Sequence, residues 1–211
     1  MTRTNSERPW LSIRRAALAV TLVATQLVGC APLLVGGAMV GGTMMVSDRR
    51  TTGTLVEDQA IELKANNRLK EVINDRSHVN VTSYNRTVLL TGEAATEADK
   101  AAIEQTVQKV DNVKSTVNEL AVTIPSALST RSNDSLLTGK VKATFIDARD
   151  LQVNAFKVIT ERGVVYLMGR VTEREATRAT ELARSVSGVQ KVVRVFEIVT
   201  EQELADSTPK K

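Results

Sequence analysis

The sequence predicts an α+β protein with two tandem copies of one small domain, each with the element order αββαβ. Three observations predict this fold: a repeat at a spacing of 77 residues, a β-hairpin pattern in each copy, and helical patterns on both sides of each hairpin. With 211 residues, the chain is long enough for two such domains and a leader segment.

The hairpin patterns are the clearest part of the repeat. The two stretches read VNVTSYNRTVLLTG at residues 79–92 and FKVITERGVVYLMG at residues 156–169. In each, apolar residues alternate around a polar turn, which is typical of a hairpin. The turn positions are Asn85-Arg86 and Arg162-Gly163. The residues expected on the buried face of the second strands are Val88, Leu90, Val165 and Leu167. Each second strand ends in a glycine, Gly92 or Gly169, where a close backbone approach is expected.

Helical patterns surround both hairpins. The helix before the first hairpin is expected to be capped by Thr54, and the one before the second to begin after Asn133 or Asp134. The apolar stripes of these two helices are Ile61, Ala65, Leu69 and Val72, and Leu137, Val141 and Phe145. The helices after the hairpins are expected to begin at Thr96 and Thr172 and to end at Asp111-Asn112 and Ser187-Gly188. Because a helical crossover joins the second and third strands, each domain should hold a three-stranded mixed sheet packed with two helices.

The N-terminal region predicts export. Residues 1–15 are basic, residues 16–28 are uncharged, and LVGC follows at residues 27–30. A basic segment, a short apolar segment and small residues near the cut are typical of a secretory signal. LVGC resembles the lipobox of bacterial lipoproteins, which implies that Cys30 is lipidated and becomes the first mature residue. The alternative is one uncleaved span over residues 16–46, which the glycines at 36, 37, 41 and 42 disfavour.

The predicted organisation follows from these patterns. Its segments are a signal peptide (1–29), a lipidated N-terminus and Gly-rich tether (30–54), the first domain (55–124), a linker (125–131), the second domain (132–200) and a disordered tail (201–211).

Composition excludes several functional classes. The net charge of +4 includes four arginines and one glutamate in residues 1–29, so the remainder holds 24 basic and 23 acidic residues. Aromatic residues make up only 3% of the chain, which argues against nucleic-acid stacking. His78 is the single histidine, and no catalytic, metal-binding or cofactor motif is recognised. The chain is interpreted as a non-enzyme, with an enzyme as the weakest alternative.

Two such units after a lipobox resemble the dual BON-domain lipoproteins of the Gram-negative outer membrane, the DolP type. The resemblance covers about residues 55–200, and its most telling segments are VNVTSYNRTVLLTG, SNDSLLTGKVKATF, GRVTEREA and RSVSGVQKV. It implies attachment to the inner leaflet of the outer membrane, facing the periplasm, and a role in envelope integrity. Ala31, which follows the cysteine, agrees with outer-membrane sorting in that family.

The resemblance also implies that the second domain recognises anionic phospholipid around its first helix. The matching positions are Leu136, Leu137, Lys140 and Lys142. Relatives can carry a tryptophan where this chain has Leu136. The charges agree with this, since residues 58–122 have a net charge of −2 and residues 133–199 of +3. Two alternatives remain open: a solvated helix face with core leucines, and a periplasmic adaptor that holds another envelope protein.

Overall fold

The computed structural model describes residues 48–73 and 76–207. These residues belong to one compact unit. The expected signal peptide, Cys30 and most of the expected tether lie outside the described residues. Within the described part of the chain, every helix is too short or too polar to cross a membrane.

The first domain has the expected element order around a mixed sheet. Its elements are α3 (Thr52–Leu69), β1 (His78–Tyr84), β2 (Thr87–Ala94), α4 (Glu97–Gln108), β3 (Ser115–Asn118) and β4 (Ala121–Val122). β1 pairs antiparallel with β2, and the helical crossover through α4 makes β3 parallel to β2. The short strand β4 continues the parallel pairing beyond a break in β3. The predicted mixed sheet is therefore confirmed, with one extra short strand.

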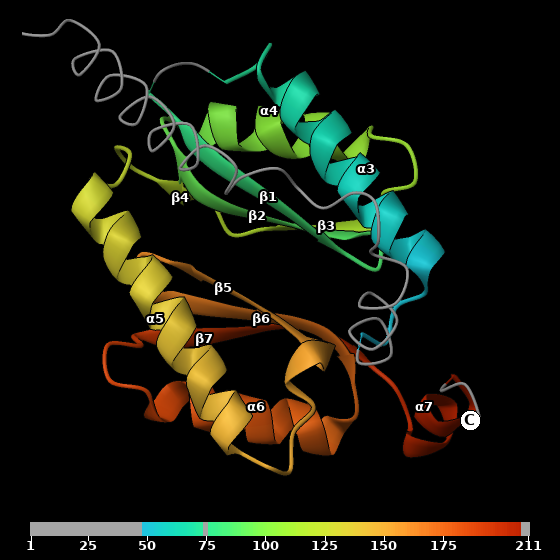
Figure 1. The fold of residues 1–211 in the computed structure, drawn as a ribbon. Coiled ribbons are helices and arrows are strands. Elements are labelled where there is room, and N and C mark those ends of the chain that lie inside the picture. The colour runs from blue at the N-terminus through green and yellow to red at the C-terminus, as the bar shows by residue number, and fades with distance from the viewer. Residues whose placement is uncertain (1–47, 74–75, 208–211) are drawn as a thin grey trace, which may run out of the picture. The chain divides into compact units, whose positions relative to one another are not determined.

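The second domain repeats this topology without the break. Its elements are α5 (Leu128–Asp147), the short helix η2 (Val153–Ala155), β5 (Phe156–Glu161), β6 (Val164–Val171), α6 (Glu173–Ser185) and β7 (Lys191–Ile198). β5 is antiparallel and β7 parallel to the central strand β6. In both domains the two helices cover one face of the sheet (Figure 1).

One face of each sheet packs against the helices, as the alternation predicts. Val88 and Leu90 in β2 and Val165 and Leu167 in β6 are fully buried, which confirms the predicted strand phase. The first core adds Ile61, Ala65 and Leu69 from α3 with Ile103 and Val107 from α4, and the second adds Val141 and Phe145 from α5 with Ala176, Ala179 and Ala183 from α6. The apolar residues predicted on the first helix of each domain therefore lie in the core, except Val72, which is exposed.

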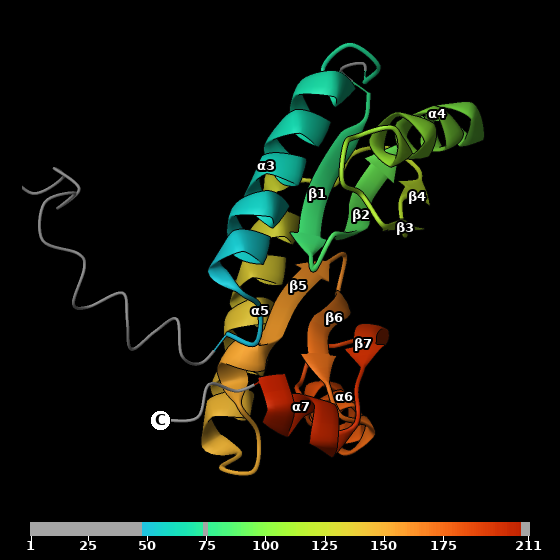
Figure 2. The same ribbon diagram turned by 90° about the vertical axis from the view of Figure 1, so that its right-hand side faces the viewer.

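The other faces of the two sheets pack against each other, which the sequence did not predict. Tyr84 and Leu89 from the first domain form a buried cluster with Tyr166 and Met168 from the second. In Figure 1 the strands lie between the helices α3 and α4 of the first domain and α5 and α6 of the second, and in Figure 2 they lie between α4 and α6. The β2 and β6 strands are therefore covered on both sides, which explains their continuous apolar runs.

The two strand-end glycines are required by close backbone contacts, as expected. A Cβ atom at Gly92 would lie 2.2 Å from the carbonyl oxygen of His78, and Gly92 has a φ of +107°. A Cβ atom at Gly169 would lie 2.5 Å from the carbonyl oxygen of Ala155. Any side chain at either position would push the antiparallel neighbour away.

Some element boundaries differ from the predictions. α3 is capped by Thr51, whose side chain accepts a hydrogen bond from the N–H of Thr54, so Thr54 is inside the helix and not its cap. α5 begins at Leu128, and not after Asn133 or Asp134, so it includes the end of the expected linker. The cap predictions at Thr96 and Thr172 are confirmed.

The expected tail from residue 201 contains a short helix, α7 (Glu201–Ser207). Its start is held by a capping box, which the sequence analysis missed. Glu203 donates its N–H to the hydroxyl of Thr200, and the Glu203 carboxylate accepts the N–H of Thr200. Residues 201–207 of the expected tail are therefore helical in the structure.

Candidate functional site

A buried aspartate from the first helix of each domain holds the hairpin turn. In the first domain the Asp58 carboxylate accepts the backbone N–H groups of Asn85 and Arg86, both at 2.8 Å. In the second, Asp134 accepts those of Arg162 and Gly163, also at 2.8 Å.

All four turn residues have positive φ, as a type I′ turn requires. Outside glycine this conformation is uncommon. The two aspartate carboxylates offset the cost of this conformation, because each accepts hydrogen bonds from both N–H groups of its turn. Asp134, which the sequence analysis considered as a helix cap, therefore caps a turn that is distant in sequence.

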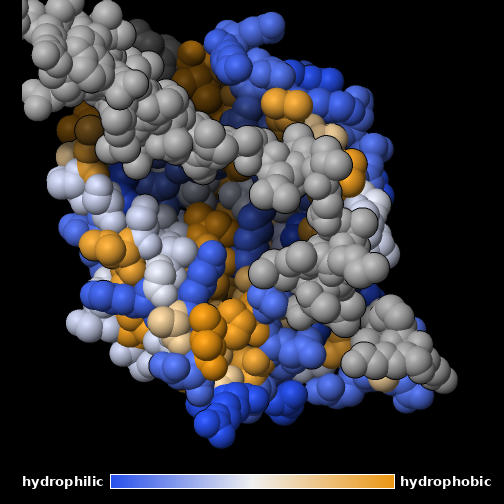
Figure 3. Space-filling view, viewed as in Figure 1, coloured by the Kyte–Doolittle hydropathy of each residue, from blue (hydrophilic) through white to orange (hydrophobic). Residues whose placement is uncertain are grey.

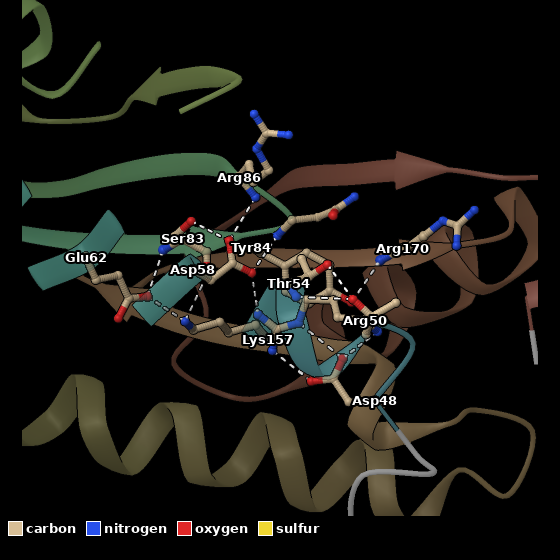
Figure 4. Close-up of polar contacts among 12 residues, drawn as sticks. Asp48, Arg50, Thr54, Asp58, Glu62, Ser83, Tyr84, Arg86, Lys157 and Arg170 are labelled. Carbon is tan, nitrogen blue, oxygen red and sulfur yellow. Dashed lines mark hydrogen bonds and ion pairs between the residues drawn. The ribbon is translucent and has the colours of Figure 1, made fainter. Parts of the chain in front are cut away.

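A polar network joins this turn region of the first domain to the second domain (Figure 4). Arg50 donates to Asp58 at 2.9 Å, and its guanidinium lies 4.2 Å from the ring centre of Tyr84. The Tyr84 hydroxyl accepts the N–H of Arg170 in the second domain at 3.3 Å. Lys157, also from the second domain, donates to the Glu62 carboxylate at 2.9 Å and to the carbonyl of Ser83.

Burial and hydrogen bonds shift the pKa values of two acidic side chains in the network, Asp58 and Tyr84. Burial raises the pKa of Asp58, but hydrogen bonds from the Arg86 backbone, Ser83 and Arg50 outweigh it, so the pKa is lowered. Burial raises the pKa of the Tyr84 phenol, which remains neutral. The network therefore holds the Asp58 carboxylate in its charged form among hydrogen-bond donors, and these contacts stabilise the fold.

The residue before Arg50 contacts the second domain directly. The guanidinium of Arg49 makes a two-pronged ion pair with the Glu175 carboxylate, with both N–O distances at 2.7 Å, and also donates to the carbonyl oxygen of Arg170. The chain that leads into α3 is thereby fixed to the start of α6.

The predicted lipid-binding residues lie on α5, but they do not share one environment. Leu136 is 66% exposed, and Lys140 and Lys142 are also exposed. Leu137 is only 7% exposed and belongs to the interior. Leu136, Leu137 and Lys140 line one groove, whereas Lys142 is not among its lining residues.

This groove, called here the linker groove, has a volume of about 1030 Å³. Its walls are residues 123–127, which lead into α5, residues of α5 from Thr130 to Lys140, the β5–β6 turn, and Ser187, Gly188 and Gln190. The linker groove therefore lies at the end of the second domain that carries the β5–β6 turn.

Sequence reasoning missed two apolar residues beside the linker groove. Ile124, which lines it, is 80% exposed, and Leu128 at the start of α5 is 78% exposed. With Leu136 they form three exposed aliphatic side chains at this end of the domain. Lys140 and Arg162 supply cationic groups to the same groove. Hydrophobic side chains also appear between polar ones over the α5 region in Figure 3. In the sequence, the apolar residues of the segment TIPSAL, residues 123–128, could have indicated this surface.

The comparisons with known proteins agree with the repeated fold. A model of the BON domain matches residues 57–124 and, separately, residues 133–200. The chain belongs to the BON-domain family. This BON protein is 37% identical over 183 residues to Outer membrane lipoprotein DolP of Haemophilus influenzae, across 85% of this chain and 94% of the relative. It is a DolP-type BON lipoprotein, and its location is the outer membrane.

Two further relatives are more distant from this BON lipoprotein. It is 32% identical over 154 residues to the 21 kDa hemolysin of Actinobacillus pleuropneumoniae, across 72% of this chain and 79% of the relative. It is 26% identical over 155 residues to Osmotically-inducible protein Y of Escherichia coli, across 72% of this chain and 77% of that relative.

Proposed function

We propose that this protein is a non-enzymatic, periplasm-facing lipoprotein that supports envelope integrity by binding anionic phospholipid through the linker-groove end of its second domain. The observation that carries the proposal is the combination of exposed Ile124, Leu128 and Leu136 with Lys140 and Arg162. Aliphatic tips can enter the headgroup region while flanking cations remain with the phosphates. Each basic residue near an anionic surface contributes about 1 kcal/mol.

The four residues named from the resemblance have different roles in this proposal. Leu136 inserts, and Lys140 contacts phosphate from the linker groove. Leu137, which is buried, supports the groove from beneath. Lys142 is exposed outside the groove, so it acts through long-range attraction.

Liposome binding tests the proposal. A fragment of residues 47–211 should bind vesicles that contain anionic phospholipid weakly, more strongly at low salt, and neutral vesicles hardly at all. Lys140→Glu with Lys142→Glu should abolish the preference for anionic vesicles, because the cations at this surface become anions. Co-sedimentation at two salt concentrations measures both effects.

The matched control carries the same charge change elsewhere. Lys109→Glu with Lys114→Glu alters two exposed lysines of the first domain and should leave binding nearly unchanged at moderate salt. Leu136→Ser should weaken binding without changing the charge. Equal binding by the wild type and the Lys140/Lys142 double variant would reject this surface, and a role as a protein adaptor would then be preferred.

Lipidation of Cys30 is the second part of the proposal. Cys30→Ala should leave an unprocessed precursor without acyl chains, because the thiol that receives lipid is absent. Each buried methylene contributes about 0.8 kcal/mol, so two or more chains hold a protein firmly on a membrane. Intact mass spectrometry of membrane fractions measures processing and acylation together. A processed wild-type chain without acyl mass would contradict this.

A further inference from the structure

Three potential metal ligands meet where the two domains contact each other. His78 begins β1 and pairs with Glu93 across the β1–β2 ladder, and the distance from its Nδ1 to the Glu93 Oε2 is 3.1 Å. Glu161, the last residue of β5, comes from the other domain. One ligand atom from each of the three residues lies within 4.8 Å of the other two.

The two carboxylates are buried and incompletely satisfied. Glu93 is fully buried, and Glu161 is 6% exposed. Within the described chain, Oε1 of Glu93 accepts no hydrogen bond. The Arg162 guanidinium lies 3.6 Å from this oxygen, beyond hydrogen-bond distance. A buried carboxylate oxygen without a donor is costly.

The neighbouring groups leave the cluster rich in acceptors. The Asn80 amide donates to Glu161 Oε2 at 2.9 Å, which satisfies one oxygen of that carboxylate. Burial raises the pKa of Glu161, and the charge of Glu93 raises it further. A third carboxylate, Asp134, and the cation Arg131 line the adjoining cavity, and Asp134 is already used by the β5–β6 turn.

We propose that His78, Glu93 and Glu161 bind a first-row divalent cation of the zinc type. One imidazole nitrogen with two carboxylate oxygens is a donor set that zinc accepts. Around a tetrahedral ion with bonds of about 2.0–2.2 Å, ligand atoms are roughly 3.3–3.6 Å apart. Small side-chain rotations from the present separations reach that spacing. The adjoining cavity of about 380 Å³, lined by His78 and Glu161, gives a fourth ligand such as water a place.

The ion would join the two domains, because its ligands come from both. No metal site was expected from the sequence, because it holds one histidine and no recognised metal-binding motif. The repeat does not duplicate the cluster, because Ala155 and Arg170 occupy the positions that match His78 and Glu93. The expected stoichiometry of this site is therefore one ion per chain.

Metal titration of the full-length chain, purified in detergent and treated with a chelator, tests the proposal. Cobalt(II) absorption should show ligand-field bands that zinc suppresses at one equivalent, and zinc should raise the unfolding temperature by mass action. His78→Gln, Glu93→Gln and Glu161→Gln should each lower zinc affinity at least tenfold and remove the thermal shift, because each loses one ligand.

Two controls separate the site from other effects. Glu181→Gln removes an exposed carboxylate on α6 and should leave affinity unchanged. Cys30→Ser should also bind zinc normally, since the proposed site contains no thiol. His78→Gln alters a partly exposed side chain, so it remains informative if the buried Glu93→Gln variant does not fold. Absence of wild-type binding, binding lost in Cys30→Ser, or undiminished binding in all folded ligand variants would overturn the proposal.

Discussion

Replacing Leu167 with alanine is expected to lower the free energy of unfolding by about 2–5 kcal/mol. Leu167 is fully buried in the central strand of the second sheet, among the side chains of the second core. Truncation removes apolar contacts and leaves a cavity that the surrounding side chains fill only in part. Chemical denaturation monitored by far-UV circular dichroism measures the change.

An exposed leucine provides the matched control for this truncation. Leu63 on α3 is 64% exposed, so Leu63→Ala should change the free energy of unfolding by less than about 0.5 kcal/mol. If Leu167→Ala and Leu63→Ala have the same denaturation midpoint as the wild type, the assigned strand phase of β6 is incorrect.

Asp58→Ala is expected to destabilise the chain by about 3–5 kcal/mol, because it breaks a buried charged network. The substitution leaves the N–H groups of Asn85 and Arg86 without their acceptor and removes one partner of Arg50. Asp134→Ala removes the acceptor of the Arg162 and Gly163 N–H groups in the second domain and should cost less. Denaturation midpoints of the two variants measure this difference.

The effect of Asp58 should depend on pH in a defined direction. Because its folded pKa lies below the ordinary value of 3.8, its stabilisation is present above that value and is lost as pH falls through the folded pKa. The difference between wild type and Asp58→Asn should therefore shrink between pH 5 and strongly acidic pH. A control variant, Asp147→Asn, alters an exposed carboxylate. If the difference in free energy of unfolding between wild type and Asp58→Asn does not depend on pH, the stabilising role assigned to the Asp58 carboxylate is wrong.

The repeated fold could be predicted because its determinants are local. Alternating apolar residues define the hairpins, and residues with positive φ, Asn112 and Gly188, lie in the turns that follow α4 and α6. Each copy also tests the other, since a turn in one implies a turn 77 residues away. The alternation of apolar residues and the 77-residue repeat were therefore sufficient to predict the strand phase and the sheet topology.

Contacts between the domains could not be predicted in the same way. Leu89 and Met168 alternate with core residues, so a single sheet would expose them to water. They are buried because the second sheet covers the first. The uninterrupted apolar run of β2 indicates that both faces of the strand are buried, but it does not identify the element that covers the second face. The turn N–H groups that Asp58 and Asp134 accept, 27 to 29 residues away, are likewise brought to these carboxylates only by folding.

The candidate site was predicted only in part. The family resemblance identified Leu136 and Lys140, which line the linker groove, but it grouped them with Leu137, which is interior. Ile124 was assigned to the end of the first domain, and its 80% exposure depends on how the chain passes from β4 into α5. The His78 cluster requires residues from both domains, so neither copy alone reveals it.

The two-pronged contact of Arg49 with Glu175 has a mechanical consequence. Tension on the chain ahead of Asp48 reaches Arg49 before it reaches α3. Part of that tension is transmitted to the second domain through Glu175, which lies in the first turn of α6. The N-terminal end of α3 is thus protected from being pulled away from its sheet. Force on this segment is therefore divided between the two domains.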